Sequence, residues 1–258
     1  MKDLFFHIFF LISTSILLAQ TPTSSWELGV FGGDSYYLGE TNQKHLLPFN
    51  VAFGPFLRYN YDDRLSLKLA LTTGQIEGND ANSSNSFNND RNFSFTSQLI
   101  EGSIICEFNF FSFSTLDPNS YKAIPYFFIG AAFTKHNPKA NFNGIPISTA
   151  SLQTEGKAFL QNIFAIPLGV GIKTRFNNWG IGLNWGIRKT FTDYMDDIST
   201  NYIPVASTTS TSQANIANTT LYSNVDNIKR GDQYNKDWYV FTGLTIFVNL
   251  TPKEVCRK

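Results

Sequence analysis

The stretch of sequence that decides the fold is IPLGVGIKTRFNNWGIGLNWGIRKTF, residues 166–191. Its large apolar residues fall at every second position, beginning with Ile166 and Leu168, and glycines or cations occupy the positions between them. A period of two predicts β-strands, because a helix would spread the same residues around its whole surface. The central pair Asn177 and Asn178 predicts a two-residue hairpin turn, since asparagine tolerates positive φ. We therefore expect two antiparallel strands with one apolar face.

The same alternation recurs along the chain in segments separated by polar, turn-rich stretches. The segments 50–61 and 64–74 form the clearest second pair, and Asp62–Asp63 joins them as a tight turn. Four further strands are expected at 26–33, 95–111, 124–134 and 238–250. Both faces of 124–134 are apolar, so the pattern does not say which of them points outward.

The connections between these strands alternate between long and short. Long loops are expected near 34–48, 75–92, 135–161 and 192–237. This alternation is typical of a membrane barrel with extended extracellular loops at one end and short periplasmic turns at the other. We therefore predict an all-β fold for residues 20–258: an eight-stranded antiparallel transmembrane β-barrel with long extracellular loops and short periplasmic turns.

A water-soluble barrel is the alternative, with its apolar faces turned inward around a ligand. Two observations favour the membrane barrel. The face opposite the apolar one consists mainly of glycine, alanine, serine, threonine and asparagine, which are too small to make a good wet exterior. Aromatic residues also lie near the strand ends, as in the interfacial girdles of membrane barrels. These residues are Trp26, Tyr59, Tyr61, Trp179 and Trp238.

The N-terminus has the features of a secretory signal peptide, which we predict at residues 1–19. Lys2 supplies a positive charge, an apolar segment follows, and the small Ala19 precedes a cut at Gln20. Beyond this segment no run of 18 apolar residues occurs, so no transmembrane helix is expected. The mature chain is then expected in the outer membrane of a diderm bacterium, in contact with outer-membrane lipid.

Composition narrows the function classes. The chain has 20 basic and 20 acidic residues, so no net charge attracts nucleic acid, and we expect no nucleic-acid partner. Its two cysteines do not make a disulfide framework. His45 and His136 lack neighbours at metal-ligand spacing, and no catalytic triad can be assembled, so we expect neither enzyme activity, nor a cofactor, nor a metal. A hydrolytic or acyl-transferring membrane enzyme is a further alternative, because triads are recognised by geometry.

Charged residues on the small-residue face would point into the lumen. They are Glu27, Arg58, Lys68, Glu101, Glu107, Lys173, Arg175 and Arg188. Eight strands enclose a lumen that side chains can fill, so these charges must pair with one another, and we predict a structural ion-pair network. An anion-conducting pore would need a wider lumen. Glycines on the same face, such as Gly171 and Gly180, are expected to make room for the long charged side chains.

Three carboxylates gather at the expected outer mouth: Asp193, Asp196 and Asp197. Three carboxylates can hold a hard cation such as calcium. We favour a local role, in which they pair with Arg188 and Lys189 and order the base of the longest loop. The tripeptide RGD at 230–232 has the form of an adhesion motif, but so short a string also arises by chance.

Six strings together resemble the PorG-like outer-membrane barrels of Bacteroidota, in the order of that family. They are ELGVFGGDSYYLGE (27–40), RYNYDDRLSLKL (58–69), EFNFF (107–111), NPKA (137–140), WGIRKTFTDYMDDIST (185–200) and NKDWYVFTGLTIF (235–247). The resemblance implies a noncatalytic accessory or structural component of the type IX protein secretion system. It would present periplasmic turns, notably 114–123, to periplasmic secretion-machinery proteins. The alternative is a stand-alone surface barrel that binds an extracellular ligand or cation through its long loops.

Overall fold

The computed structural model describes residues 24–113, 123–219 and 228–251. The predicted signal peptide lies outside these residues, as does most of the predicted docking turn 114–123. No helix in the described ranges is long and apolar enough to cross a membrane.

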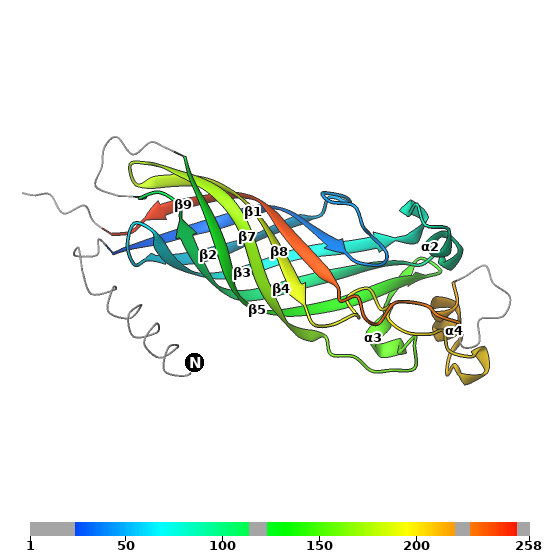
Figure 1. The fold of residues 1–258 in the computed structure, drawn as a ribbon. Helices are drawn as coiled ribbons and strands as arrows, with labels where there is room; N and C mark the ends of the chain where they lie inside the picture. The colour runs from blue at the N-terminus through cyan, green and yellow to red at the C-terminus, as the bar shows by residue number, and fades with distance from the viewer. Residues whose placement is uncertain (1–23, 114–122, 220–227, 252–258) are drawn as a thin grey trace, which may run out of the picture.

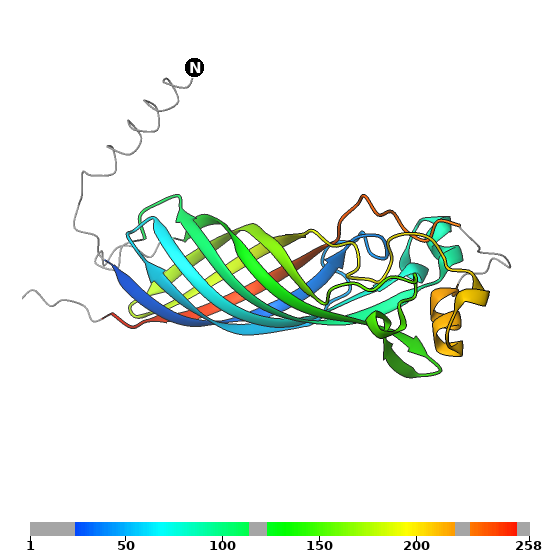
Figure 2. The same ribbon diagram turned by 90° about the horizontal axis from the view of Figure 1, so that it is seen from below.

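Eight long strands of the described chain close into an antiparallel barrel, as predicted (Figures 1 and 2). They are β1 (Ser25–Leu38), β2 (Val51–Asn60), β3 (Leu65–Asn79), β4 (Ser94–Asn109), β5 (Ile124–Phe142), β7 (Asn162–Phe176), β8 (Trp179–Thr190) and β9 (Trp238–Asn249). The spatial order is β4-β3-β2-β1-β9-β8-β7-β5, and pairing of β4 with β5 closes the ring. Closure leaves these strands without an unpaired edge along the barrel wall.

The predicted hairpin at 177–178 is present, since β7 ends at Phe176, β8 begins at Trp179 and Asn177 has a φ of 55°. The strands are longer at the other end than their apolar pattern predicts. β3 and β4 stay paired as far as Asn79 opposite Ser94, and β5 runs on to Phe142, where the four-residue strand β6 (Ile145–Ser148) pairs with it. The predicted long loops near 34–48, 75–92 and 135–161 are therefore partly strand. The pattern missed the extensions of β3 and β5 because their outward residues are polar.

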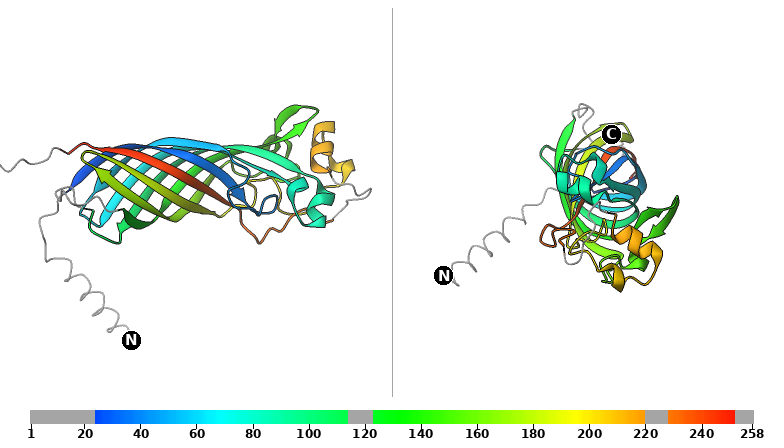
Figure 3. Two further views of the ribbon diagram at one scale, coloured as in Figure 1. Left: turned by 90° about the horizontal axis from the view of Figure 1, so that it is seen from above. Right: turned by 90° about the vertical axis from the view of Figure 1, so that its right-hand side faces the viewer.

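Short helices cover the end of the barrel opposite the two ends of the described chain (Figures 1 and 3). They are the 3-10 turns η2 (Asp80–Asn82) and η3 (Val205–Ser207) and the helices α2 (Ser86–Arg91), α3 (Thr149–Leu152) and α4 (Thr211–Ala217). We call this end the outer end, and we call the described parts of 39–50, 80–93, 143–161 and 191–237 the outer cap.

The outer wall of the barrel is apolar over a limited height. On β3, Leu71 is 63% exposed, whereas its neighbour Thr72 is 7% exposed and faces inward. The apolar outward residues end near Leu71, Ile100 and Phe133, and the outward residues beyond them are polar. On β4 the apolar stretch thus spans about ten residues, the length that a tilted strand needs to cross a bilayer.

Aromatic residues lie at the edge of this band that is farther from the outer end, which we call the lower edge. Trp26 packs on Tyr59 with ring centroids 4.7 Å apart, and Trp179 is exposed at the hairpin turn of β7 and β8. The structure also decides the face of β5. Phe127, Ile129 and Phe133 point outward, while Ile124, Tyr126 and Phe128 are buried in the lumen.

Candidate functional site

The structure places all eight predicted lumen charges inside the barrel, where each is at most 7% exposed. They occupy the inward positions of the alternating strands, so that their side chains converge from both walls. Ion pairs divide them into two groups. The lower cluster comprises Glu27, Arg58, Lys68, Glu107, Lys173 and Arg175, and the upper pair, nearer the outer end, comprises Glu101 and Arg188.

Glu107 is the centre of the lower cluster. Its carboxylate lies 2.8 Å from Lys68 Nζ, 2.9 Å from Lys173 Nζ and 3.0 Å from Arg58 Nε. Arg58 also donates to Glu27 at 2.8 Å, and Glu27 pairs with Arg175 from the opposite wall. Two carboxylates thus link four cations contributed by β2, β3 and β7.

Aromatic rings fill the space around these charges. The Arg58 guanidinium lies 5.0 Å from the ring centroid of Phe56 and 5.0 Å from that of Phe247. The lumen glycines make room mainly for such rings and not, as predicted, for the charged chains. A Cβ on Gly180 would lie 2.2 Å from Phe247, and one on Gly171 would lie 2.4 Å from Tyr126. The lower lumen is therefore a packed plug of rings and ion pairs.

The upper pair is held by a tyrosine. Arg188 Nε lies 3.2 Å from Glu101, and the Tyr239 hydroxyl donates to the same carboxylate at 2.7 Å. The Arg188 guanidinium also lies 4.5 Å from the Phe241 ring centroid. This group closes the lumen below the outer cap.

At the base of the outer cap, the hydroxyl of Tyr37 of β1 lies between two buried carboxyls. It is 2.7 Å from Asp196 Oδ2 and also contacts Asp237 Oδ1. A phenol has one proton and can donate it to only one of the two. Both contacts are full hydrogen bonds when the other carboxyl is protonated and donates to the phenol oxygen, so this arrangement favours retention of a proton by the three side chains.

The pKa values of the acidic groups in the outer cap are raised, in agreement with this geometry. Burial, followed by the charge of Asp196, raises the pKa of Asp237 well above its usual value. Burial also raises the pKa of Asp196 to about 6, and those of Asp193 and Asp197 to about 7. Burial together with Asp196 raises the pKa of Glu40 to about 8. The cap thus concentrates acidic groups that bind protons near neutral pH.

Arg230 anchors the longest connection from inside. Its Nη1 donates to Glu155 Oε1 at 3.1 Å and to the main-chain oxygen of Asp197 at 2.5 Å, and its guanidinium lies 4.9 Å from the Phe93 ring. Because the Arg230 side chain is 1% exposed, the RGD tripeptide does not present its arginine at the surface.

The predicted partners of the three mouth aspartates are wrong. Arg188 points into the lumen toward Glu101, and Lys189 packs over the Trp238 ring at 5.5 Å, whereas the cation beside Asp197 is Arg230. Within the described residues no group of three or more acidic, histidine or cysteine side chains is arranged to hold a metal ion. Asp196 accepts hydrogen bonds from the Tyr37 hydroxyl and the Ile198 N–H, and Asp197 accepts one from the Thr154 hydroxyl, whereas neither carboxylate oxygen of Asp193 has a hydrogen-bond partner among the described residues.

Sequence reasoning missed most of the cap network. Its unpredicted members are Tyr37, Glu40, Asp80, Arg91, Glu155, Arg230 and Asp237. Arg91 binds both oxygens of Asp80 at 2.7 Å and donates to the main-chain oxygen of Arg230 at 2.8 Å. Only the resemblance strings carried a signal, since Tyr37, Glu40 and Asp237 lie within them.

The two described histidines, His45 and His136, form no hydrogen bond with the acidic groups of the outer cap. His136 is buried with Nε2 3.1 Å from the Leu160 carbonyl oxygen, and His45 Nδ1 lies 3.4 Å from the Tyr36 hydroxyl.

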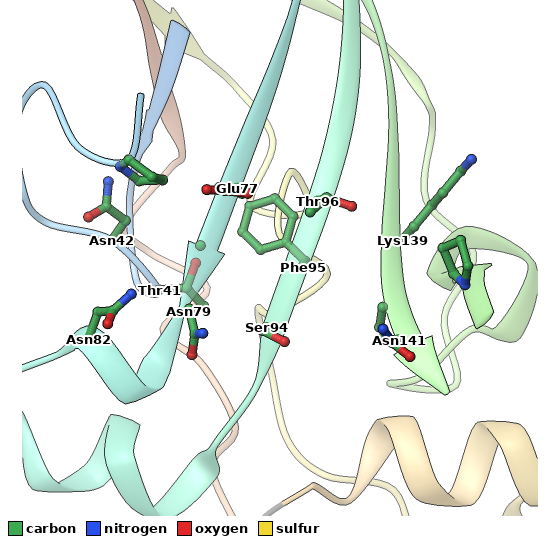
Figure 4. A pocket seen from close by; sticks show the side chains of 14 residues that line it. Thr41, Asn42, Glu77, Asn79, Asn82, Ser94, Phe95, Thr96, Lys139 and Asn141 are labelled. Atoms are coloured by element: carbon green, nitrogen blue, oxygen red, sulfur yellow. The ribbon is translucent and has the colours of Figure 1, made fainter. Parts of the chain in front are cut away.

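A polar cleft of about 330 Å³ opens beside the outer cap (Figure 4). Its outward row is Glu77 of β3, Thr96 of β4 and Lys139 of β5, which are register neighbours, and Phe95 lies beside them. Asn42 and other amide side chains of the cap line the opposite side. The cleft can hydrogen-bond a hydroxyl-rich ligand.

Together these features define a class: closed β-barrels with an apolar outer band, a charge-filled lumen and a folded cap at one end. The chain belongs to the family described as "Domain of unknown function (DUF6089)", whose model matches residues 2–256. A comparison with the curated proteins gave no match.

Three solved structures are among those similar to the chain. The N-terminal β-barrel domain of Pseudomonas aeruginosa OprF has 14% identity and a TM-score of 0.37, over 90% of this chain and 100% of that one. Ail of Yersinia pestis, in complex with the heparin analogue sucrose octasulfate, has 10% identity and a TM-score of 0.39, over 88% and 97%. Neisserial surface protein A has 10% identity and a TM-score of 0.39, over 87% and 97%.

Proposed function

We propose that the protein is a noncatalytic outer-membrane β-barrel that acts as an accessory component of protein secretion, in the manner that its resemblance to PorG-like barrels implies. The observation that carries this proposal is the filled lumen. Among the described residues, six charges joined by ion pairs of about 3 Å and the rings around them fill the lower barrel. We therefore place the functional surfaces at the two ends of the barrel and do not propose transport through its lumen.

The apolar band supports the membrane location. Transfer of such a band into water would expose a large continuous apolar surface, which monomeric soluble proteins avoid. Lipid removes that cost, and closure of the barrel satisfies the backbone inside the bilayer. Cell fractionation tests this step: we expect the protein in the outer membrane, with heat-modifiable migration on gels. A soluble monomer obtained without detergent would contradict it.

The secretion role is supported by where the resemblance strings meet. Tyr37 and Glu40 come from the first string, Asp196 from the fifth and Asp237 from the last, and contacts within the outer cap bring them together. The strings that carry the resemblance thus build one structure at the outer end.

Deletion of the gene tests this role. We expect loss of secreted cargo in the deletion strain, restored by the wild-type chain, and recovery of secretion-machinery proteins with it after mild detergent extraction. As a matched pair, Tyr37→Phe, which breaks the cap network, should impair secretion, whereas Tyr234→Phe at an exposed position should not. Normal secretion in the deletion strain would refute the proposal.

The polar cleft favours a second candidate function, the binding of an extracellular polysaccharide at the outer end. Hydroxyl-rich ligands need closely spaced hydrogen-bonding groups. Glu77, Thr96 and Lys139 provide a carboxylate, a hydroxyl and an ammonium on one surface, and Asn42 adds an amide. The test is binding of surface polysaccharide from the producing cells to the purified protein. Glu77→Ala with Lys139→Ala should abolish binding, and Lys229→Ala, at an exposed position outside the cleft, should not. Equal binding by both variants would exclude this site.

A further inference from the structure

We propose that the lumen holds a binding site for a small monovalent anion, with chloride as the natural candidate, in a cavity between Lys68 of the lower cluster and Arg188 of the upper pair. The proposal concerns the interior of the barrel and does not depend on the role in secretion.

The cavity is small and partly lined by polar side chains. It has a volume of about 30 Å³, and its polar lining consists of Lys68, Thr72, Ser103, Asn184, Arg188 and Thr245. The remaining lining includes the buried rings of Phe31, Phe56 and Phe241. A cavity of roughly 10–15 Å³ already accommodates one water molecule, so this one holds a single halide ion or one to two waters.

The charges around the cavity do not balance. In the lower cluster, Glu27 and Glu107 face four cations, so its formal charge is +2, and the upper pair is neutral. No carboxylate lines the cavity, although two cations do. The surplus acidic groups lie on the outer cap, away from this lining. Buried charge without a counterion is costly in a low-dielectric interior, and an anion beside Lys68 and Arg188 removes part of that cost.

The lining groups also have hydrogen-bond donors to spare. An ammonium has three donors, and among the described residues Lys68 has one ion-pair partner, Glu107 at 2.8 Å. Arg188 directs Nε and Nη2 to Glu101 and Nη1 to the Gly186 carbonyl, which leaves two of its five N–H groups. The Ser103 hydroxyl is buried and has no hydrogen-bond partner among the described residues.

Asn184 also has an unpaired acceptor in the lining, since its Oδ1 has no donor within the described chain. Rotation of the amide by half a turn places its NH2 group at the same position, where it donates to an anion. Water is the competing occupant, and it would satisfy Ser103 and Asn184 without offsetting the charge. The experiment must therefore distinguish an anion from water.

Crystals of the detergent-purified full chain, soaked in sodium bromide, provide the direct test. We expect an anomalous bromide peak between Lys68 Nζ and the Arg188 guanidinium. A refined structure in which this cavity contains only water, with bromide elsewhere on the surface, would overturn the proposal.

Thermal unfolding provides the test in solution. We expect a higher Tm in sodium chloride than in sodium gluconate at equal ionic strength, because gluconate is too large for the cavity. Ser103→Ala should remove most of this chloride-dependent difference. Ser97→Ala is the matched control, since Ser97 is a buried hydroxyl on the same strand that bonds Asn137 outside the cavity. A chloride effect of the same size in wild type and both variants would reflect surface ions and would refute the site.

Discussion

Replacement of Glu107 by glutamine is the sharpest test of the lumen as an ion-pair plug. The change keeps the shape of the side chain but removes the negative charge that Arg58, Lys68 and Lys173 share at 2.8–3.0 Å. The formal charge of the lower cluster then rises from +2 to +3, with Glu27 as its only remaining carboxylate.

The expected cost follows from burial. Glu107 and Arg58 are 0% exposed and the Lys68 side chain is 6% exposed, so the range of about 0–1 kcal/mol for surface pairs does not apply. Loss of one partner from a buried ion pair costs about 3–5 kcal/mol, because the other charges stay buried without compensation. The unfolding equilibrium constant should therefore increase by roughly two to four powers of ten.

Urea unfolding in lipid vesicles, followed by tryptophan fluorescence and heat-modifiable migration, measures this effect. Glu77→Gln is the control, because Glu77 lies at the polar outer end of β3, and it should change the unfolding free energy little. Adding Lys68→Met to Glu107→Gln returns the formal charge of the lower cluster to +2 and should recover part of the loss. A change below about 1 kcal/mol in Glu107→Gln, the level of a surface pair, would refute the reasoning.

Three further predictions concern the cap and the barrel wall. Burial raises the pKa of Asp196 to about 6 and that of Asp237 well above its usual value, so folding binds protons that the unfolded chain releases. The stability that these groups contribute is complete below about pH 4 and is lost as the pH rises through 6 and beyond. Protease cleavage of the cap should therefore be faster at pH 9 than at pH 5. Equal rates would contradict this. Arg230→Met leaves buried carboxylates without their guanidinium and should make the cap protease-sensitive at neutral pH, while the barrel keeps its heat-modifiable migration. Gly33→Ala should cost about 1–3 kcal/mol, because its Cβ would lie 2.1 Å from a carbonyl oxygen of β9, whereas Gly32→Ala meets open space and should be neutral in the same urea assay.

Some features of the fold could be predicted from the local sequence alone. Alternation in 166–191 placed Lys173, Arg175 and Arg188 on the inner face because a strand has a period of two, whatever its partner is. The turn at 177–178 was readable for the same reason, since asparagine tolerates positive φ locally. The pattern did not give the face of β5, where both faces are apolar, and it missed the polar strand extensions at the outer end.

The sequence by itself therefore determined the eight strands and the inward direction of the lumen charges, because both depend on neighbours one or two positions apart, and the alternation of long and short connections determined the antiparallel order. Only the tertiary structure decided which charges pair and how the outer cap is built. Tyr37 meets Asp237 across 200 positions, and Arg188 meets Glu101 across 87. Such contacts arise when barrel closure and the burial of the cap bring distant loops together, and no local spacing encodes them.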